Sequence, residues 1–424
     1  MGWSRLVPVT QEFPHRGLKD VFAAARTALR DRAIGSNLPP DARVAITAGS
    51  RGVSNLSTVI QAAVSHFHEL GLKPFVIPAM GSHGGGTPQG QLDVLARYGV
   101  TESKVGCPVL SSLDVVELGK TAEGIPTYMD RHAFASGGVF LVNRVKWHTT
   151  YEAPIESGLT KMAAVGLGKL HGAATYHRHA VRLGLGTVMR AAGRHVIASG
   201  KILGGLALLE GAHHETAETV ALLPHEIDSE EPRLLERVRA WMPRILFPEV
   251  DVLMVEEVGK HISGVGMDSK VVNRHPYGGA NLWPWAPKIF RIYVRSLSPQ
   301  SYGNAVGVGM ADVISEGMYQ AIDWDTTRVN ATTSSNLTSI RTPVRTQTDR
   351  EALELLSKVV GRDRQEDVTI AWIQNTLELS QIAVTENLGV VDGVQSVGEP
   401  LEWEFDNAGN LAGGLERVLQ AAAA

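Results

Sequence analysis

The 424-residue chain contains a single cysteine, Cys107. One cysteine excludes an intramolecular disulfide and also excludes a thiolate metal cluster within one chain. Any metal that this protein holds must therefore take its ligands from histidine, from carboxylate or from a group imported with the metal. Cys107 itself precedes Pro108 and is interpreted as a small buried residue.

Long apolar runs and blocks of like charge are also missing. No apolar run reaches the ~18 residues of a membrane span, and the N-terminus lacks the basic start and apolar core of a signal peptide. The net charge is −4, with acids and bases interspersed, so nucleic acid and anionic membrane are poor candidates for partners. We expect a cytoplasmic protein that acts on a small molecule, and a homo-oligomer is compatible with this expectation.

Several familiar catalytic and nucleotide-binding motifs are absent. The segment GSHGGGT lacks the Gly-Lys-Ser/Thr of a P-loop, and GNAVGVG lacks the spacing of a dinucleotide fingerprint. HExxH, GxSxG and CxxC do not occur. A metalloprotease, a nucleophile-elbow hydrolase and a dithiol redox protein are therefore disfavoured.

What is present is an alternation of strands and helices. Apolar runs at 43–49 and 73–79 predict strands on either side of a helix over 54–70, and 138–145 predicts a third strand. A second series begins with a strand at 250–258, whereas the Pro- and Trp-containing segment 276–300 is expected to be irregular. We predict two α/β domains, residues 1–248 and 249–424, with mainly parallel, Rossmann-like sheets and an active-site cleft between them.

Polar and glycine-rich loops follow three of these strands. Ser50 and Arg51 come after the first, His83 lies among glycines after the second, and His148 follows the third. Ligands of parallel sheets collect at the carboxyl ends of the strands, and imidazole titrates near neutral pH. Two histidines from separate strand ends suit a reaction that inverts one carbon, which needs an acid or base on each face.

The stretch from Lys146 to His179 is rich in basic side chains. Lys161 and His177 lie sixteen residues apart within it, which in a continuous helix would separate them by ~24 Å. A turn must therefore intervene if both contact one ligand, and we expect Gly166 and Gly168 to supply it. The sequence does not rank His177 against the neighbouring histidines, which are His171 and His179.

These residues together resemble the nickel-dependent lactate racemase family. The resemblance covers mainly residues 40–185, with a weaker echo around 257–264. It is carried by Ser50-Arg51, Gly81-Ser82-His83, His148, Lys161 with Val165-Gly166, and His177. The most specific part is the spacing from Lys161 to His177 with a Val-Gly between them.

The resemblance implies a nickel pincer nucleotide, a pyridinium-3,5-bisthiocarboxylic acid mononucleotide that carries nickel and is made by cofactor-synthesis enzymes. Lys161 would be joined to it, with Ser50 and Gly166 also at the cofactor, and His177 would coordinate nickel. His83 and His148 would be the paired acid and base. Arg51 would bind cofactor phosphate or substrate carboxylate, and Lys260 would orient the carboxylate. The implied activity is racemisation or epimerisation of a 2-hydroxy acid by reversible hydride transfer.

The chain departs from the family pattern at several positions. Ala48 stands where the family has an acidic residue, Gly52 replaces a proline, and the residues before Lys161 differ. These departures favour a 2-hydroxy acid other than lactate. Two further hypotheses stay open: an NAD(P)-dependent hydroxy-acid oxidoreductase, indicated by the glycine-rich turns, and a non-catalytic relative that binds a metal or carboxylate.

Overall fold

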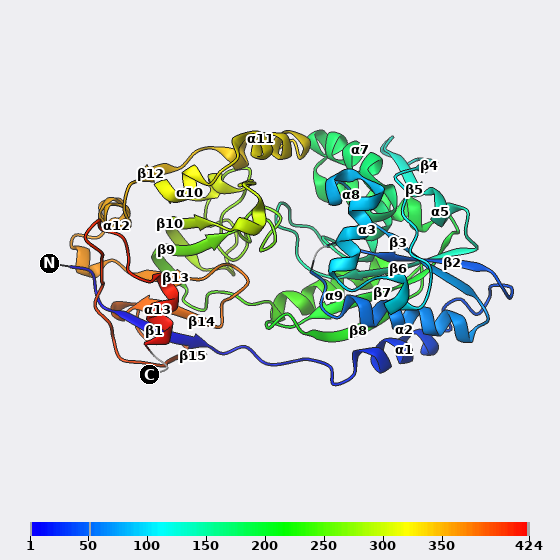
Figure 1. Cartoon of the computed structure of the whole chain (residues 1–424), viewed down its shortest axis with the longest axis horizontal. Coiled ribbons are helices and arrows are strands. Elements are labelled where there is room, and N and C mark those ends of the chain that lie inside the picture. The colour runs from blue at the N-terminus through cyan, green and yellow to red at the C-terminus, as the bar shows by residue number, and fades with distance from the viewer. Residues whose placement is uncertain (1, 51, 422–424) are drawn as a thin grey trace. The chain divides into compact units, whose positions relative to one another are not determined.

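The computed structural model describes residues 2–50 and 52–421, which divide into two compact units. Residues 14–242 form what we call the N-terminal unit, and residues 1–13 with 243–424 form the C-terminal unit. Figure 1 shows the elements of both along the chain. Among the described residues, no helix is long and apolar enough to cross a membrane.

The N-terminal unit is built on a five-stranded sheet in the order β3-β2-β6-β7-β8. The first four strands are parallel, and β8 is antiparallel to β7. A separate antiparallel pair, β4 and β5, lies outside this sheet. The strands are β2 (Arg43–Ala48), β3 (Lys73–Pro78), β4 (Val115–Lys120), β5 (Pro126–Asp130), β6 (Gly138–Arg144), β7 (Ile202–Glu210) and β8 (Thr216–Leu222).

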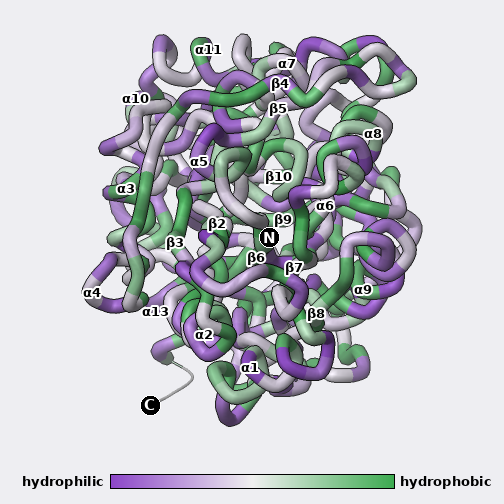
Figure 2. Tube along the Cα trace, turned by 90° about the vertical axis from the view of Figure 1, so that its right-hand side faces the viewer, coloured by the Kyte–Doolittle hydropathy of each residue, from purple (hydrophilic) through white to green (hydrophobic). Residues whose placement is uncertain are grey.

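Helices of this unit cover the sheet because its strands are apolar almost throughout. The helix from Leu56 packs its apolar stripe, including Ile60 and Phe67, on Ile46 and Phe140 of the sheet. In Figure 2 the trace of β3 is hydrophobic, whereas α9, the last helix of the unit, carries hydrophilic stretches. The helices are α1 (Val21–Asp31), α2 (Leu56–Glu69), α3 (Pro88–Arg97), α4 (Glu102–Val105), α5 (Arg131–Phe134), α6 (Leu159–Lys161), α7 (Leu167–Leu183), α8 (Leu185–Ile197) and α9 (Ile227–Trp241).

The C-terminal unit contains an eight-stranded sheet in the order β12-β11-β10-β9-β13-β14-β1-β15. The strands from β12 to β13 are parallel, and β14, β1 and β15 are antiparallel. The strands are β1 (Leu6–Gln11), β9 (Glu249–Val258), β10 (Lys288–Leu297), β11 (Val313–Ser315), β12 (Val344–Thr346), β13 (Ile370–Ile373), β14 (Gln381–Thr385) and β15 (Val394–Ser396). The helices are α10 (Glu316–Gln320), α11 (Trp324–Thr333), α12 (Asp349–Ser357) and α13 (Gly414–Gln420).

Two mainly parallel α/β units confirm the predicted fold class. The observed division differs from the predicted boundary at 248/249 in two respects. It falls between residues 242 and 243, and residues 1–13 belong with the C-terminal unit. The reason is β1, which in Figure 1 lies in blue beside late-sequence elements. It pairs with both β14 and β15 and so satisfies backbone groups that a sheet edge would leave open.

The sequence predicts an irregular segment over 276–300, but only part of it is irregular. Its second part is β10, a ten-residue strand that pairs in parallel with β9. Lys288 at its start and the arginines within it interrupt the apolar run, but Ile289, Ile292 and Val294 are fully buried. Both tryptophans and three of the four prolines lie in the loop before β10, which masked the strand signal, and Pro299 follows the strand.

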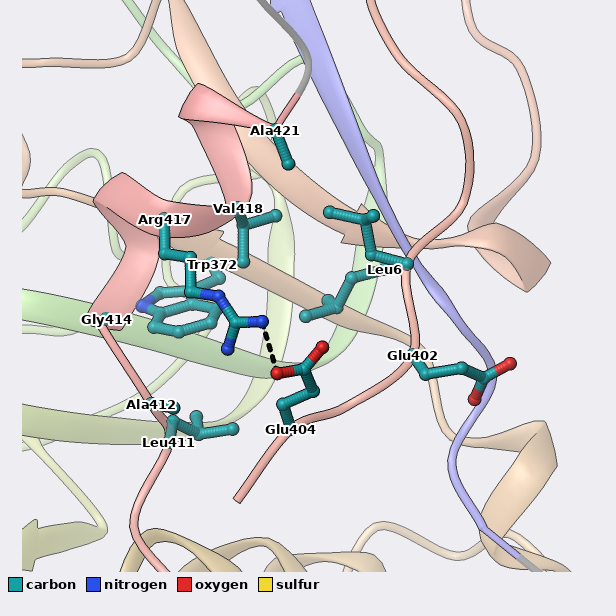
Figure 3. A pocket seen from close by; sticks show the side chains of 11 residues that line it. Leu6, Trp372, Glu402, Glu404, Leu411, Ala412, Gly414, Arg417, Val418 and Ala421 are labelled. Atoms are coloured by element: carbon teal, nitrogen blue, oxygen red, sulfur yellow. Dashed lines mark hydrogen bonds and ion pairs between the residues drawn. The ribbon is translucent and has the colours of Figure 1, made fainter. Parts of the chain in front are cut away.

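The C-terminal unit holds a small pocket, shown in Figure 3, with a volume of about 90 Å³. Arg417 of α13 and Glu404 form an ion pair on its wall, and Trp372 lines the same pocket. Its other lining residues are Leu6, Leu401, Glu402, Leu411, Ala412, Gly414, Val418 and Ala421. None of the described residues predicted for the functional site lines this pocket.

Candidate functional site

The carboxyl ends of β2, β3 and β6 lie along one edge of the N-terminal sheet, because these strands are parallel neighbours. The loop after β2 carries Ser50, and the loop after β3 carries His83. The two residues are brought into contact: the Ser50 hydroxyl and His83 Nδ1 share a hydrogen bond. The sequence placed both at this edge, and the structure adds the direct contact between them.

Arg51 lies outside the described residues, so its predicted contacts with phosphate or carboxylate stay a prediction. The loop that follows it is anchored by Glu210 at the end of β7. The carboxylate of Glu210 accepts a hydrogen bond of 2.8 Å from Ser54 N and forms an ion pair of 2.5 Å with Arg144. Arg144 Nη1 also donates to Gly52 O at 3.3 Å. Glu210 therefore holds the segment that follows Arg51, directly at Ser54 and through Arg144 at Gly52.

The His83 loop depends on a close approach between two glycines. Gly84 has a φ of +64°, and a Cβ placed on it would lie 2.3 Å from the carbonyl carbon of Gly90. Only glycine tolerates this combination of backbone angle and crowding. Thr87 then caps α3 by accepting a hydrogen bond of 3.1 Å from Gly90 N. The glycines predicted from sequence thus shape the turn that carries His83.

His148 lies in the loop after β6, which is organised by a buried carboxylate. Glu156 accepts a hydrogen bond from the backbone N–H of His148 and forms an ion pair with Arg239 of α9. The His148 ring stacks on Tyr151, with 4.4 Å between centroids. Thr150 N donates to His148 Nδ1 at 3.1 Å.

A backbone N–H can only donate, so Nδ1 of His148 is an acceptor in this arrangement. In a neutral imidazole the other nitrogen then carries the proton. We therefore assign the Nε2–H tautomer to His148. Its ring offers a hydrogen-bond donor at Nε2, and protonation of Nδ1 requires the contact with Thr150 to open.

Lys161 and His177 lie on one broken helical run. It consists of α6, a π-helical turn over Met162–Gly166, and α7. The predicted turn at Gly166 and Gly168 is wrong in position. Gly166 is helical, with φ −60° and ψ −55°, whereas Lys169 breaks the helix with φ 55° and ψ −154°. π-helical turns are rare and occur frequently at functional sites.

The glycines of this run serve packing. A Cβ on Gly166 would lie 2.3 Å from Met162 Sδ and 3.2 Å from the carbonyl oxygen of Ala79, in the loop after β3. A Cβ on Gly168 would lie 3.4 Å from the Tyr176 ring. The missing side chain at Gly166 lets the helix approach the loop after β3, whereas a Cβ on Gly168 would make an ordinary contact with Tyr176.

The two halves of the run meet the same loop. Before the break, Gly166 contacts Ala79; after it, Ala173 lies so near Gly81 that a Cβ on Gly81 would be 3.1 Å from Ala173 Cβ. Residues four apart share a helix face. His177 lies four residues after Ala173, and Lys161 lies about one turn before the Gly166 contact. Both therefore lie about one turn from contacts with the loop that leads to His83.

This geometry separates the three histidines that the sequence left unranked. His177 continues the helix face that contacts the His83 loop through Ala173. His171 is exposed, and its ring meets the edge of Tyr128, with 4.5 Å between centroids. His179 lies two residues, or roughly 200°, around the helix from His177.

Glu231 of α9 is a site residue that sequence reasoning missed. It is 2% exposed, and its carboxylate accepts hydrogen bonds from Thr160 N at 3.1 Å and from the Thr160 hydroxyl. A Cβ on Gly158 would overlap its Oε1. Glu231 therefore fixes the start of α6, one residue before Lys161. Burial raises the pKa of Glu231 to about 7.

A signal for Glu231 was present in the sequence. The buried positions of α9 are Ile227, Glu231, Leu234, Leu235 and Val238. They follow the helical spacing of an apolar stripe, and Glu231 is the charged member. A carboxylate at such a position is costly unless it is hydrogen-bonded, so it indicates a specific partner.

Lys260 lies in the C-terminal unit, just after β9. Its backbone N–H donates to Ser301 Oγ at 2.8 Å, and its Nζ hydrogen-bonds to Asn330 Oδ1 of α11. These contacts hold the lysine at a strand end, as the sequence predicted for its loop. Its contact with a substrate carboxylate stays a prediction.

The side chains that could ligate a metal can be compared with what the nickel pincer nucleotide needs. Within residues 2–50 and 52–421, no group of three or more His, Cys, Asp and Glu side chains is arranged to hold a metal ion. A single imidazole such as His177 suits a metal that brings its remaining ligands with it. Lys161 lies partly buried on the same helical run, and a lysine side chain ends in a primary amine. The residues present thus fit a metal-carrying nucleotide that is attached to the chain.

Comparison with known proteins gives likenesses among solved structures. No protein-family model and no curated protein sequence matches the chain. Among solved structures, it is similar to the lactate racemase apoprotein from Thermoanaerobacterium thermosaccharolyticum, with a TM-score of 0.48 and 11% identity. The alignment covers 88% of this chain and 99% of that chain.

Proposed function

We propose that this protein is an isomerase that inverts the hydroxyl-bearing carbon of a 2-hydroxy acid. The observation that carries the proposal is the broken helix from Leu159 to Leu183. On this helix, Lys161 and His177 each lie about one helical turn from a residue that contacts the loop leading to His83. A tethering amine, a metal ligand and an acid–base group on adjoining segments are what this chemistry needs.

Lys161 and His177 would hold the nickel pincer nucleotide, the first through a covalent link and the second through its imidazole. When bound, this cofactor supplies a hydride acceptor, so that the reacting carbon can become planar and receive hydride on its other face. Ser50 and Gly166 would lie at the cofactor through the loop and helix that carry them. Glu231 supports the site by holding the helix start before Lys161.

The two histidines have different roles in this proposal. When His83 Nδ1–H donates to Ser50 Oγ, its Nε2 has a lone pair and takes the proton of the substrate hydroxyl. His148 presents Nε2–H and donates a hydrogen bond to substrate oxygen. To act as a base on the second face, His148 must carry its proton on Nδ1 instead of Nε2. The hydrogen bond from Thr150 N to Nδ1 must then open.

Two cations are proposed for the anionic groups. Arg51 would bind cofactor phosphate or substrate carboxylate in bidentate fashion. Lys260 would orient the carboxylate as a point charge, and Asn330 holds its Nζ in place for this.

The deciding experiment uses the full chain, made in a host that also makes the cofactor-synthesis enzymes. We expect the intact mass to show an adduct that maps to Lys161, together with about one nickel per chain. Lys161→Ala should lose the adduct, and His177→Ala should keep the adduct but lose nickel. His171→Ala is the matched control, because His171 is exposed on another side of the same helix.

Folded wild-type protein with an unmodified Lys161 and no nickel would refute the proposal. Chiral analysis of a panel of 2-hydroxy acids, from lactate to larger sugar acids, then identifies the substrate. Inversion without net redox change supports the isomerase. Net reduction of soluble NAD(P) would instead identify the oxidoreductase.

A further inference from the structure

Lys169, at the break in the helix, is fully buried and makes contacts with three elements. Its Nζ donates to the carbonyl oxygen of Pro78 at the end of β3, at 2.5 Å, and to Gln91 Oε1 of α3, at 2.8 Å. Asp130 Oδ2, at the end of β5, lies 3.7 Å away. Both Lys169 and Asp130 have side chains with 0% exposure.

Gln91 extends this contact to the loop that leads to His83. Its side-chain oxygen accepts from Lys169, and its Nε2 donates to Gly81 O at 3.0 Å. The Gln91 side chain is itself fully buried. A continuous chain of hydrogen bonds thus joins the helix break to a carbonyl two residues before His83.

The backbone of Lys169 is strained where it makes these contacts. A φ of 55° with a ψ of −154° is a conformation that is largely reserved for glycine. Such strain persists only where surrounding contacts determine it. The contacts of the Lys169 side chain, on three separate elements, supply that determination.

The charges of the cluster are costly to bury. Burial lowers the pKa of Lys169 to about 8, and Asp130 opposes this shift. Burial likewise raises the pKa of Asp130, with Lys169 and then His132 as the opposing charges. Two well-packed apolar residues would stabilise a fold as well or better. Stability alone therefore does not explain the pair.

We propose that Lys169 is a positioning residue that fixes the helix break to the loop carrying His83. The break turns a run that would otherwise separate Lys161 from His177 by ~24 Å. Through Gln91, the same side chain sets the backbone at Gly81. Lys169 does not contact the reacting atoms. Its consequence for turnover rests on the function proposed above, whereas its effect on the loop does not.

The test compares Asp130→Asn with the double variant Lys169→Met/Asp130→Asn. Asp130 Oδ1 accepts the capping hydrogen bonds of His132 N and Ala133 N, whereas Oδ2 faces Lys169. Asparagine keeps the capping oxygen and removes the charge. Methionine keeps much of the lysine volume without its donors. The double variant thus leaves no buried charge uncompensated, and Lys120→Met, at an exposed lysine of β4, is the matched control.

We expect the double variant to have a urea midpoint at or above that of Asp130→Asn, because Asp130→Asn alone leaves the buried Lys169 charge uncompensated. Amide hydrogen exchange over residues 79–86 should become at least tenfold faster, while exchange in β2 stays unchanged. With cofactor present, kcat should fall at least tenfold and KM should change less than twofold. Lys120→Met should match the wild type in all three measurements.

Wild-type exchange over residues 79–86 in the double variant would overturn the proposal. Should the double variant fail to fold, Gln91→Met decides, because it breaks the link to Gly81 and leaves the charge pair in place. Faster exchange in Gln91→Met supports the proposal, and unchanged exchange refutes it. If the wild type carries no adduct and has no turnover, the proposed function fails, and the exchange measurement still decides the role of Lys169.

Discussion

Replacing Glu231 by glutamine should change how stability depends on pH. The wild-type carboxyl has a pKa of about 7 in the folded protein, against 4.5 as its ordinary value. A folded-state pKa raised above the unfolded value means that the folded state binds the proton more tightly. The contribution of Glu231 is therefore fully present below pH 4.5 and is lost as the pH rises through 7.

The magnitude follows from the same two values. A displacement of the pKa from 4.5 to about 7 corresponds to roughly 3 kcal/mol between the two ends of this pH range. Glutamine keeps an acceptor oxygen for Thr160 N and has no charge to bury. Glu231→Gln should therefore match the wild type near pH 4.5 and exceed its stability by up to about 3 kcal/mol at pH 8.

Urea unfolding of the wild type and Glu231→Gln at several pH values from 4.5 to 8.5 measures this difference. Tryptophan fluorescence follows the transition, and Trp241 at the end of α9 reports on the N-terminal unit. The matched control is Glu236→Gln, at an exposed position of the same helix, which should show no such pH dependence. A difference between Glu231→Gln and wild type that stays constant with pH would refute the reasoning.

Four further substitutions test the site. His83→Gln should lower kcat by about 10² or more, because it removes a proton acceptor, whereas His148→Gln keeps a donor and should cost only about tenfold; steady-state rates on one 2-hydroxy acid compare them. Gly166→Ala should destabilise the fold by about 1–3 kcal/mol, because its Cβ would overlap Met162 Sδ, and intact mass should show less cofactor adduct. Lys260→Met should raise KM with little change in kcat if it binds the carboxylate equally in the ground and transition states; a fall in kcat alone would contradict that role.

Much of the N-terminal unit could be predicted because its signals are local. The apolar runs at 43–49, 73–79 and 138–145 correspond to β2, β3 and β6 with differences of a residue at their ends. Parallel strands place their carboxyl ends together, so the sequence order alone indicated that Ser50 and His83 share an edge. Their hydrogen bond then confirmed that these two loops meet.

Other parts depended on partners distant in sequence. β1 could not be assigned to the C-terminal unit, because its pairing partners β14 and β15 begin roughly 380 residues later in the chain. Lys169 looked like one more lysine of a basic stretch until Gln91 and Asp130 gave it buried contacts. The tautomer of His148 followed only from the backbone direction at Thr150.

The sequence by itself determined the α/β class, the strand-end loops and the spacing of Lys161 and His177, because each is written in local apolar periods, glycines and residue counts. Tertiary structure alone decided where the helix turns. Glycine permits a break but does not impose one, so Gly166 and Gly168 stayed helical or served packing. The break lies at Lys169, since a buried ammonium must reach its acceptors, and those acceptors lie on other strands and helices.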